Sequence, residues 1–201
     1  MTTPTKPHTG MRVSVAEFLE LELPEPDDKL KMELDDGVLY IMPRPRAGHL
    51  FVQGELQHHF KLYRDGFAEP PLEAWYDLTI SVPSELPRLF VPDLTIILRG
   101  GATVDMERMV VEGIPDIVVE VLSSDPNRDL VRKRQVYAEA GIPEYWIFDW
   151  RAATALLLEL QDGVYVERAM LSVGDTLTTP LLPGLAIPLS SIFRHRHPPA
   201  G

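Results

Sequence analysis

One stretch, residues 114–150, constrains the fold of this chain more than any other. It predicts a strand, a capped turn, a helix and a second strand, in that order. Residues 117–122 are an almost unbroken run of β-branched and aliphatic side chains, typical of a strand buried on both faces. Ser124 or Asp125 can cap the helix that follows, and Gly141 is a typical residue just beyond a helix end. This order of elements favours an α/β fold.

Two charged residues of this stretch fall where apolar side chains are expected. Glu120 interrupts the buried strand, and a buried carboxylate is costly unless a cation or a metal ion neutralises it. At about 100° per residue, the packing face of the helix comprises Leu130, Lys133, Val136, Tyr137 and Ala140. Arg132 and Gln135 point away from that face. Glu120 and Lys133 would each relieve the burial of the other, either as a structural ion pair or as part of a functional site.

Further acids lie in or near the strands upstream. Asp93 follows Pro92 inside an apolar run, and Asp116 follows Pro115 just before the buried strand. Asp116 would share a sheet face with Glu120, because the two are an even number of residues apart. From the residues alone, either aspartate qualifies as the partner of Glu120. Glu33 is most simply a strand residue that faces solvent, and a functional role for it stays open.

The remaining pattern predicts both helices and antiparallel strands. The expected elements are a helix capped by Ser14 over 15–23, a hairpin over 30–42, a helix over 47–64, strands over 74–82 and 89–98, a hairpin of strands 155–160 and 164–170, a short strand over 185–187 and a turn over 189–193. His49, near the start of the second helix, is either a structural histidine or a residue on the substrate side.

Composition bounds the class of protein. With 201 residues, 45% of them hydrophobic, we expect a single domain over 13–193, a disordered tail over 1–12 and a flexible tail over 194–201. The absence of cysteine excludes disulfides and Cys-based zinc sites. No secretion signal or membrane-length apolar run is present, so we expect a cytoplasmic protein without a membrane partner.

Charge argues against broad attraction to nucleic acid. The net charge is −11, whereas non-specific DNA or RNA binding needs clustered Lys and Arg. A local cluster does exist, since Arg128, Arg132, Lys133 and Arg134 lie within seven residues. These side chains either form a solvated helix face or contact phosphate.

Asp93, Glu120 and Lys133, in this order, suit metal-assisted chemistry. Carboxylates that converge from adjacent strands favour Mg²⁺ or Mn²⁺, which can lower the pKa of a bound water. A nearby lysine can position or deprotonate that water, or stabilise the transition state.

At these residues the sequence resembles the PD-(D/E)xK nuclease superfamily and, more closely, the Uma-two family of putative restriction endonucleases. The matching segments are MELDDG (32–37), the region of His49, VPDLTII (91–97), GIPDIVVEVLSS (113–124), the positions of Asp129, Lys133 and Tyr137, GIPEYWIFD (141–149) and GDTLTTPLLPGLAIPL (174–189). The resemblance implies a restriction-endonuclease-like fold: a central mixed sheet flanked by helices, with a C-terminal antiparallel extension.

The resemblance also implies roles for individual residues. Asp93 resembles the first metal-binding acid and Glu120 the second, with the Val121 carbonyl as a further ligand. Lys133 resembles the motif lysine, although the superfamily usually places it two residues after the acid, where this chain has Leu122. Glu33 resembles an additional acid from the N-terminal part of the core.

Weaker matches include Asp129, Gln135 and Tyr137. The substrate-side residues that we expect are His49, Arg128, Arg132 and Arg134.

The function that follows as an expectation is divalent-metal-dependent hydrolysis of phosphodiester bonds in nucleic acid, with DNA the favoured polymer. Asp93, Glu120, Lys133 and Glu33 would be the catalytic residues, Mg²⁺ or Mn²⁺ the cofactor, and a homo-oligomer such as a dimer the working form. Two alternatives stay open: a binding module for nucleic acid or protein that keeps the fold without turnover, and a metal-dependent hydrolase of a small phosphorylated substrate.

Overall fold

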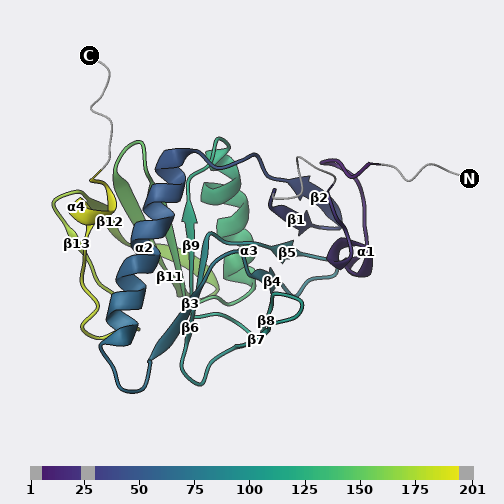
Figure 1. Ribbon diagram of the computed structural model, residues 1–201. Coiled ribbons are helices and arrows are strands. Elements are labelled where there is room, and N and C mark those ends of the chain that lie inside the picture. The colour runs from purple at the N-terminus through teal and green to yellow at the C-terminus, as the bar shows by residue number, and fades with distance from the viewer. Residues whose placement is uncertain (1–5, 24–29, 195–201) are drawn as a thin grey trace, which may run out of the picture.

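The computed structural model describes residues 6–23 and 30–194 of the chain (Figure 1). In this part the protein is a mixed α/β structure with two six-stranded sheets, a two-stranded sheet and few helices. None of the helices in these ranges is long and apolar enough to cross a membrane. The α/β prediction is confirmed, whereas a second large sheet was not predicted.

The central sheet has the strand order β12-β11-β10-β9-β6-β3. Its strands are β3 (Leu72–Trp75), β6 (Leu94–Leu98), β9 (Ile117–Val121), β10 (Glu144–Asp149), β11 (Thr154–Gln161) and β12 (Val164–Ser172). Within this sheet, as far as the structure describes the chain, β9 and β10 are the one parallel pair. Parallel neighbours need a crossover connection, here supplied by the π-helix η1 (Arg128–Lys133) and α3 (Arg134–Glu139).

Helices cover both faces of the central sheet (Figure 1). Val119 and Val121 pack in one hydrophobic cluster with residues of α2 (Ala47–Asp65). Val118, on the other face of β9, packs in a second cluster with Val136 and Tyr137 of α3. Because successive strand residues alternate in direction, Glu120 points to the α3 face. The predicted arrangement of a buried strand flanked by helices is therefore confirmed.

The second sheet has the order β2-β1-β5-β4-β8-β7. Its strands are β1 (Met32–Asp35), β2 (Val38–Ile41), β4 (Thr79–Ser81), β5 (Leu89–Phe90), β7 (Thr103–Asp105) and β8 (Val110–Glu112). The predicted strands over 74–82 and 89–98 were wrong as continuous elements, since each divides and supplies one piece to each sheet. The first breaks near Asp77, whose φ of 51° lies in the left-handed region. The second breaks between Phe90 and Leu94, which places Asp93 at the junction of the two sheets.

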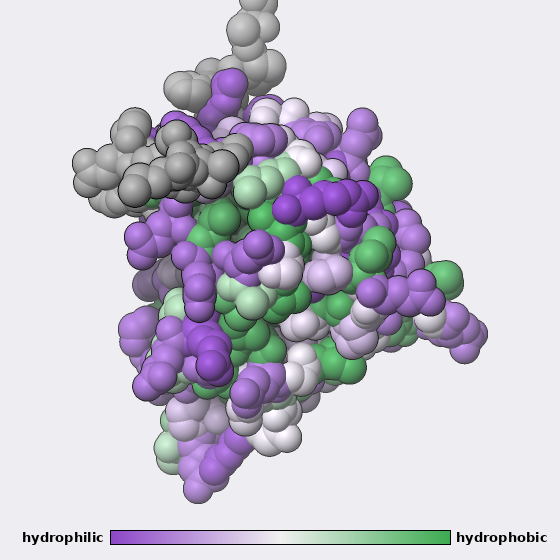
Figure 2. All heavy atoms as spheres, turned by 90° about the vertical axis from the view of Figure 1, so that its right-hand side faces the viewer, coloured by the Kyte–Doolittle hydropathy of each residue, from purple (hydrophilic) through white to green (hydrophobic). Residues whose placement is uncertain are grey.

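The end of the molecule that carries α1 (Val15–Leu19) mixes exposed apolar and hydrophilic residues (Figure 2). Ser14 caps α1 and forms a capping box with Glu17, as the pattern predicts, but the helix ends four residues earlier than expected. The described part of the predicted N-terminal tail lies against the second sheet: the Gly10 N–H donates a hydrogen bond to the Leu39 carbonyl.

The C-terminal half follows the predicted pattern closely. β11 and β12 form a hairpin that turns at Asp162 and Gly163, and both strands extend the central sheet. β13 (Thr176–Leu177) pairs with β14 (Ile187–Pro188), and α4 (Leu189–Ile192) follows. Of the predicted flexible tail, residues 195–201 lie outside the described residues.

Candidate active site

Asp93 and Glu120 lie on neighbouring strands of the central sheet. Asp93 immediately precedes β6, and Glu120 is in β9, whose Val119 is registered opposite Leu94. The Val121 N–H donates to Oδ2 of Asp93 at 2.8 Å. Their exposed fractions are only 5% for Asp93 and 3% for Glu120. The antiparallel pairing of β6 and β9 thus holds two buried carboxylates at one end of these strands.

Two basic side chains from other parts of the chain contact Asp93. Lys31 Nζ lies 2.8 Å from Oδ1 of Asp93 and 2.7 Å from Oδ1 of Asp77. His49 Nε2, from the first turn of α2, is 3.2 Å from the same Asp93 oxygen. Burial would raise the pKa of Asp93, but the hydrogen bond from His49 and the charge of Lys31 outweigh it and hold that pKa well below its usual range. Asp93 is therefore a carboxylate at neutral pH.

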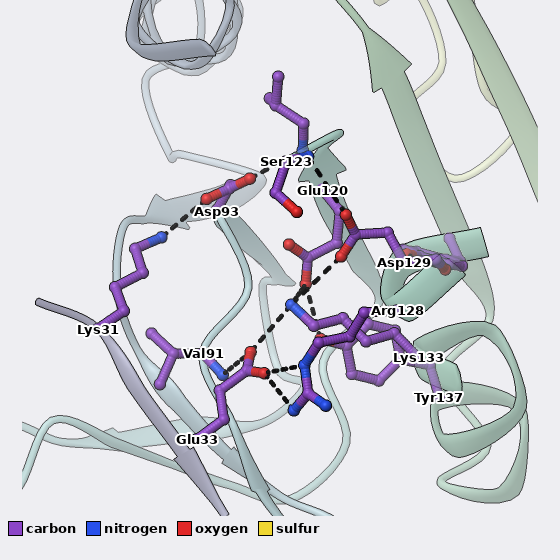
Figure 3. Close-up of polar contacts among 12 residues, drawn as sticks. Lys31, Glu33, Val91, Asp93, Glu120, Ser123, Arg128, Asp129, Lys133 and Tyr137 are labelled. Carbon is purple, nitrogen blue, oxygen red and sulfur yellow. Dashed lines mark hydrogen bonds and ion pairs between the residues drawn. The ribbon is translucent and has the colours of Figure 1, made fainter. Parts of the chain in front are cut away.

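Glu120 faces a lysine and a tyrosine on the crossover connection (Figure 3). Lys133 Nζ and the Tyr137 hydroxyl each lie 2.8 Å from Oε1 of Glu120. In Figure 3 the other oxygen of Glu120 points away from Lys133, toward the side on which Asp93 lies. Lys133 Nζ is also 2.9 Å from Oε1 of Glu33 and 3.7 Å from Oδ1 of Asp129. One buried ammonium group thus lies within 4 Å of three buried carboxylates.

Burial and the mutual repulsion of these carboxylates change the pKa values of the groups at the site. Burial raises the pKa of Glu120 to about 8, because the attraction of Lys133 is countered by the nearby carboxylates of Asp93 and Asp129. Burial also raises the pKa of Asp129. Burial alone would lower the pKa of Lys133, but Glu120 and Glu33 raise it above its ordinary value. The lysine therefore remains an ammonium group, while Glu120 and Asp129 bind a proton more readily than ordinary carboxylates do.

The π-helix η1 determines which side chains of the crossover point inward. Its wider i→i+5 turn replaces the first part of the single α-helix that the sequence predicts. Asp129 and Lys133 are buried, as expected for Lys133, while Leu130 is 36% exposed. The prediction that Leu130 packs inward was therefore wrong, and Asp129 takes its place beside the site.

These residues line a cavity of about 350 Å³. Its buried lining includes Glu33, Asp93, Glu120, Asp129 and Lys133. Lys31, His49 and Gln53 also line it, and the Gln53 side-chain amide donates to the Asp93 carbonyl at 2.8 Å. Lys31 and Gln53 were not singled out from the sequence: alternation in the strand made Lys31 look solvent-facing, and Gln53 lies in an ordinary helical pattern.

The three arginines expected on the substrate side do not line the cavity. Arg128 donates to Oε2 of Glu33 from Nε at 3.0 Å and from Nη2 at 2.7 Å, and its guanidinium lies 4.1 Å from the Tyr40 ring centre. Arg132 donates to Asp36 at 2.8 Å and also binds Asp35. Arg134 donates to the Tyr165 carbonyl at 2.7 Å. All three connect η1 and α3 to other parts of the fold.

Asp116 lies apart from the site. Its Oδ2 accepts a hydrogen bond from the Leu98 N–H at 2.7 Å, and the residue does not line the cavity. Of the two candidate partners for Glu120, the structure brings Asp93 to the cavity. Gln135 also points away, where its amide bonds Glu139 at 2.8 Å on the surface.

The donor set fits a hard divalent cation. Asp93 and Glu120 offer carboxylate oxygens, the ligands that Mg²⁺ and Mn²⁺ prefer. Among the residues that the structure describes, no group of three His, Cys, Asp or Glu side chains is placed to hold a metal ion. Mg²⁺ typically uses one or two protein carboxylates and completes its shell with water and substrate phosphate. The two acids are the ligands this protein would contribute.

Comparison with known proteins places this chain in a family. The family model Uma2, described as "Putative restriction endonuclease", matches residues 15–190. The chain belongs to the Uma2 family. The matched range includes every residue of the site from Lys31 to Tyr137. No curated protein matches the chain.

The Uma2 chain also shares its fold with a solved structure, a protein described as a putative nuclease belonging to DUF820 from Anabaena variabilis. The two align with a TM-score of 0.71 over 90% of this chain and 98% of the other. Their sequences are 17% identical, so this likeness concerns the fold.

Proposed function

We propose that this Uma2 protein is a divalent-metal-dependent nuclease that hydrolyses phosphodiester bonds, with DNA as the favoured substrate. The observation that carries the proposal is the pair of buried carboxylates, Asp93 and Glu120, on adjacent strands that line one cavity with Lys133. A buried ammonium surrounded by three acids is an expensive arrangement for a purely structural purpose, and perturbed groups of this kind cluster at functional sites.

Asp93 and Glu120 would hold the cation, which when bound supplies positive charge for a phosphodiester oxygen and a water of lowered pKa. Lys133 orients Glu120 through its 2.8 Å contact and adds fixed positive charge beside the reacting phosphate. Because its neighbours stabilise the ammonium form, Lys133 acts as a cation and hydrogen-bond donor rather than as the base. Glu33 positions Lys133 from the opposite side at 2.9 Å.

A small phosphorylated substrate is the second candidate. The cavity of about 350 Å³ lies in the size range of small-ligand pockets, roughly 300–1,000 Å³. A third possibility, a binding module without turnover, would retain the same fold and cation-binding acids.

Cleavage assays distinguish these functions. Plasmid DNA, single-stranded DNA and a chromogenic phosphodiester are incubated with Mn²⁺ and either wild type or the Glu120→Gln variant. DNA cleavage by wild type alone supports the nuclease. Hydrolysis of only the small diester supports the second candidate, and no turnover by a folded wild type that binds Mn²⁺ supports the binding module.

A further inference from the structure

The mouth of the cavity differs in charge from its interior. Arg44 and Arg46, in the loop between β2 and α2, and Arg151, just after β10, line the cavity and are exposed. The acids of the lining are buried with one exception, Asp77, which forms an ion pair with Lys31. Among the described residues that line the cavity, the exposed charged side chains therefore include these three arginines and one aspartate, on a chain with a net charge of −11.

The position of Arg151 is fixed by its surroundings. Its Nη1 donates to the Ser123 carbonyl at 3.3 Å, and its guanidinium lies 4.4 Å from the centre of the Trp150 ring. Arg151 therefore links the loop after β9, which carries Glu120, to the end of β10. A guanidinium has five N–H donors, so the contact with Ser123 leaves capacity for a phosphate at the mouth.

We infer that Arg44, Arg46 and Arg151 form a phosphate-binding rim through which one unpaired DNA strand enters the cavity. This inference rests on the proposed function and specifies its substrate. A phosphate drawn in by the rim would next meet the acids of the interior, where a cation held by Asp93 and Glu120 would offset their charge. The rim thus takes the substrate-side role that Arg128, Arg132 and Arg134 cannot take from outside the cavity.

The burial of the acids favours a single strand over a duplex. Asp93 and Glu120 are 5% and 3% exposed, so a scissile phosphate must leave the surface to reach them. Duplex DNA is stiff, with a persistence length of about 50 nm, and extruding one of its nucleotides costs a few kcal/mol. A single strand is flexible and carries about half the charge per unit length, so it is also less strongly repelled by the acidic remainder of the protein.

Binding without turnover tests the rim directly. Fluorescence anisotropy with a labelled 20-nucleotide single strand, in EDTA and over a range of NaCl concentrations, compares wild type with the triple variant Arg44→Gln, Arg46→Gln, Arg151→Gln. The matched control is Arg64→Gln, Arg99→Gln, Arg108→Gln, which removes the same charge at positions outside the cavity lining. Thermal melting checks that each variant is folded.

We expect the rim variant to bind at least tenfold more weakly at low salt. Its log–log salt slope should fall by about 2, at roughly 0.7 per lost phosphate contact. The control should stay within twofold of wild type, and a duplex of the same length should bind wild type at least tenfold more weakly than the single strand.

The inference would be overturned by equal losses in the two triple variants, by unchanged binding of the rim variant, or by preference for the duplex. Competition by a dinucleotide as effective as the 20-mer would also overturn it in favour of a small substrate. The binding assay needs neither metal nor cleavage, so it is independent of the proposed function. If the rim arginines bind the single strand in a protein that never cleaves DNA, the proposed function is refuted and the phosphate-binding rim is still supported.

Discussion

Lys133 Nζ lies 2.8 Å from Oε1 of Glu120, and this contact joins the π-helix to the buried strand of the central sheet. The two residues are 13 positions apart, on either side of the turn that starts the crossover. Glu33 approaches the same ammonium from the second sheet at 2.9 Å. Lys133 therefore connects three parts of the fold at the point where the cavity forms.

Replacing Lys133 by methionine should strongly destabilise the protein. The variant leaves Glu120, Glu33 and Asp129 without their shared cation, and breaking a buried ion pair from one side costs roughly 3–5 kcal/mol. Urea unfolding measures the loss. Adding Glu120→Gln to Lys133→Met should recover part of it, whereas strictly additive effects would mean that the two residues are not coupled. The exposed Arg108→Met is the control and should leave the unfolding midpoint unchanged.

Replacing Lys31 by methionine should tighten Mn²⁺ binding. The Lys31 ammonium occupies Oδ1 of Asp93 at 2.8 Å, so it competes with any cation for that carboxylate. Calorimetry should show an affinity at least tenfold higher, equivalent to about 1.4 kcal/mol. Lys61→Met, at an exposed position of α2, should have no effect. Weaker binding by Lys31→Met would instead mean that the lysine holds Asp93 in its binding orientation.

The variants Asp93→Asn and Asp116→Asn should show which of the two aspartates is the cation ligand. Asp93 lines the cavity, whereas Asp116 is engaged by the Leu98 N–H at 2.7 Å outside it. Mn²⁺ affinity should fall at least tenfold in the first variant and stay within twofold in the second. The opposite pattern, in folded proteins, would move the cation site to Asp116.

Two glycines of α2 offer a test of how the cavity wall is packed. A Cβ at Gly48 would lie 2.2 Å from the Trp150 ring, so Gly48→Ala should destabilise the protein by roughly 1–3 kcal/mol. Gly54 has nothing within 4 Å, and Gly54→Ala should stabilise the helix by up to about 1 kcal/mol. Thermal unfolding of both variants measures this. Equal effects would show that Trp150 does not pack closely on α2.

Much of the fold could be predicted because the local signals agree with each other. The run around Glu120 is apolar on both sides, and burial on both faces of β9 is what the structure has. Helix 47–64 and the hairpin at Asp162 and Gly163 carry equally clear periodicity and turn residues. The side chain of Lys133 was correctly placed on the packing face because its neighbours Val136 and Tyr137 lie on that face too.

Other features of the fold and the site depend on tertiary contacts, which the periodicity of the sequence does not predict. The strand over 89–98 appears continuous in sequence, yet it divides between two sheets, and this division is what leaves Asp93 at their junction. The π-helix η1 (Arg128–Lys133) has no sequence signal of its own, so the burial of Asp129 could not be predicted from periodicity. The cationic cluster around Arg132 suggested a substrate surface because nothing in the sequence shows that Asp35 and Asp36 bind that arginine.

The most direct test of the proposed cation site is a calorimetric titration of Mn²⁺ into wild type and Glu120→Gln. We expect wild type to bind Mn²⁺ and the variant, folded by circular dichroism, to lose at least tenfold in affinity. Such a result would identify Glu120 as a cation ligand beside Lys133. A folded wild type that binds no Mn²⁺, or equal affinity in the two proteins, would contradict the proposed cation site and leave Glu120 and Lys133 as a structural ion pair.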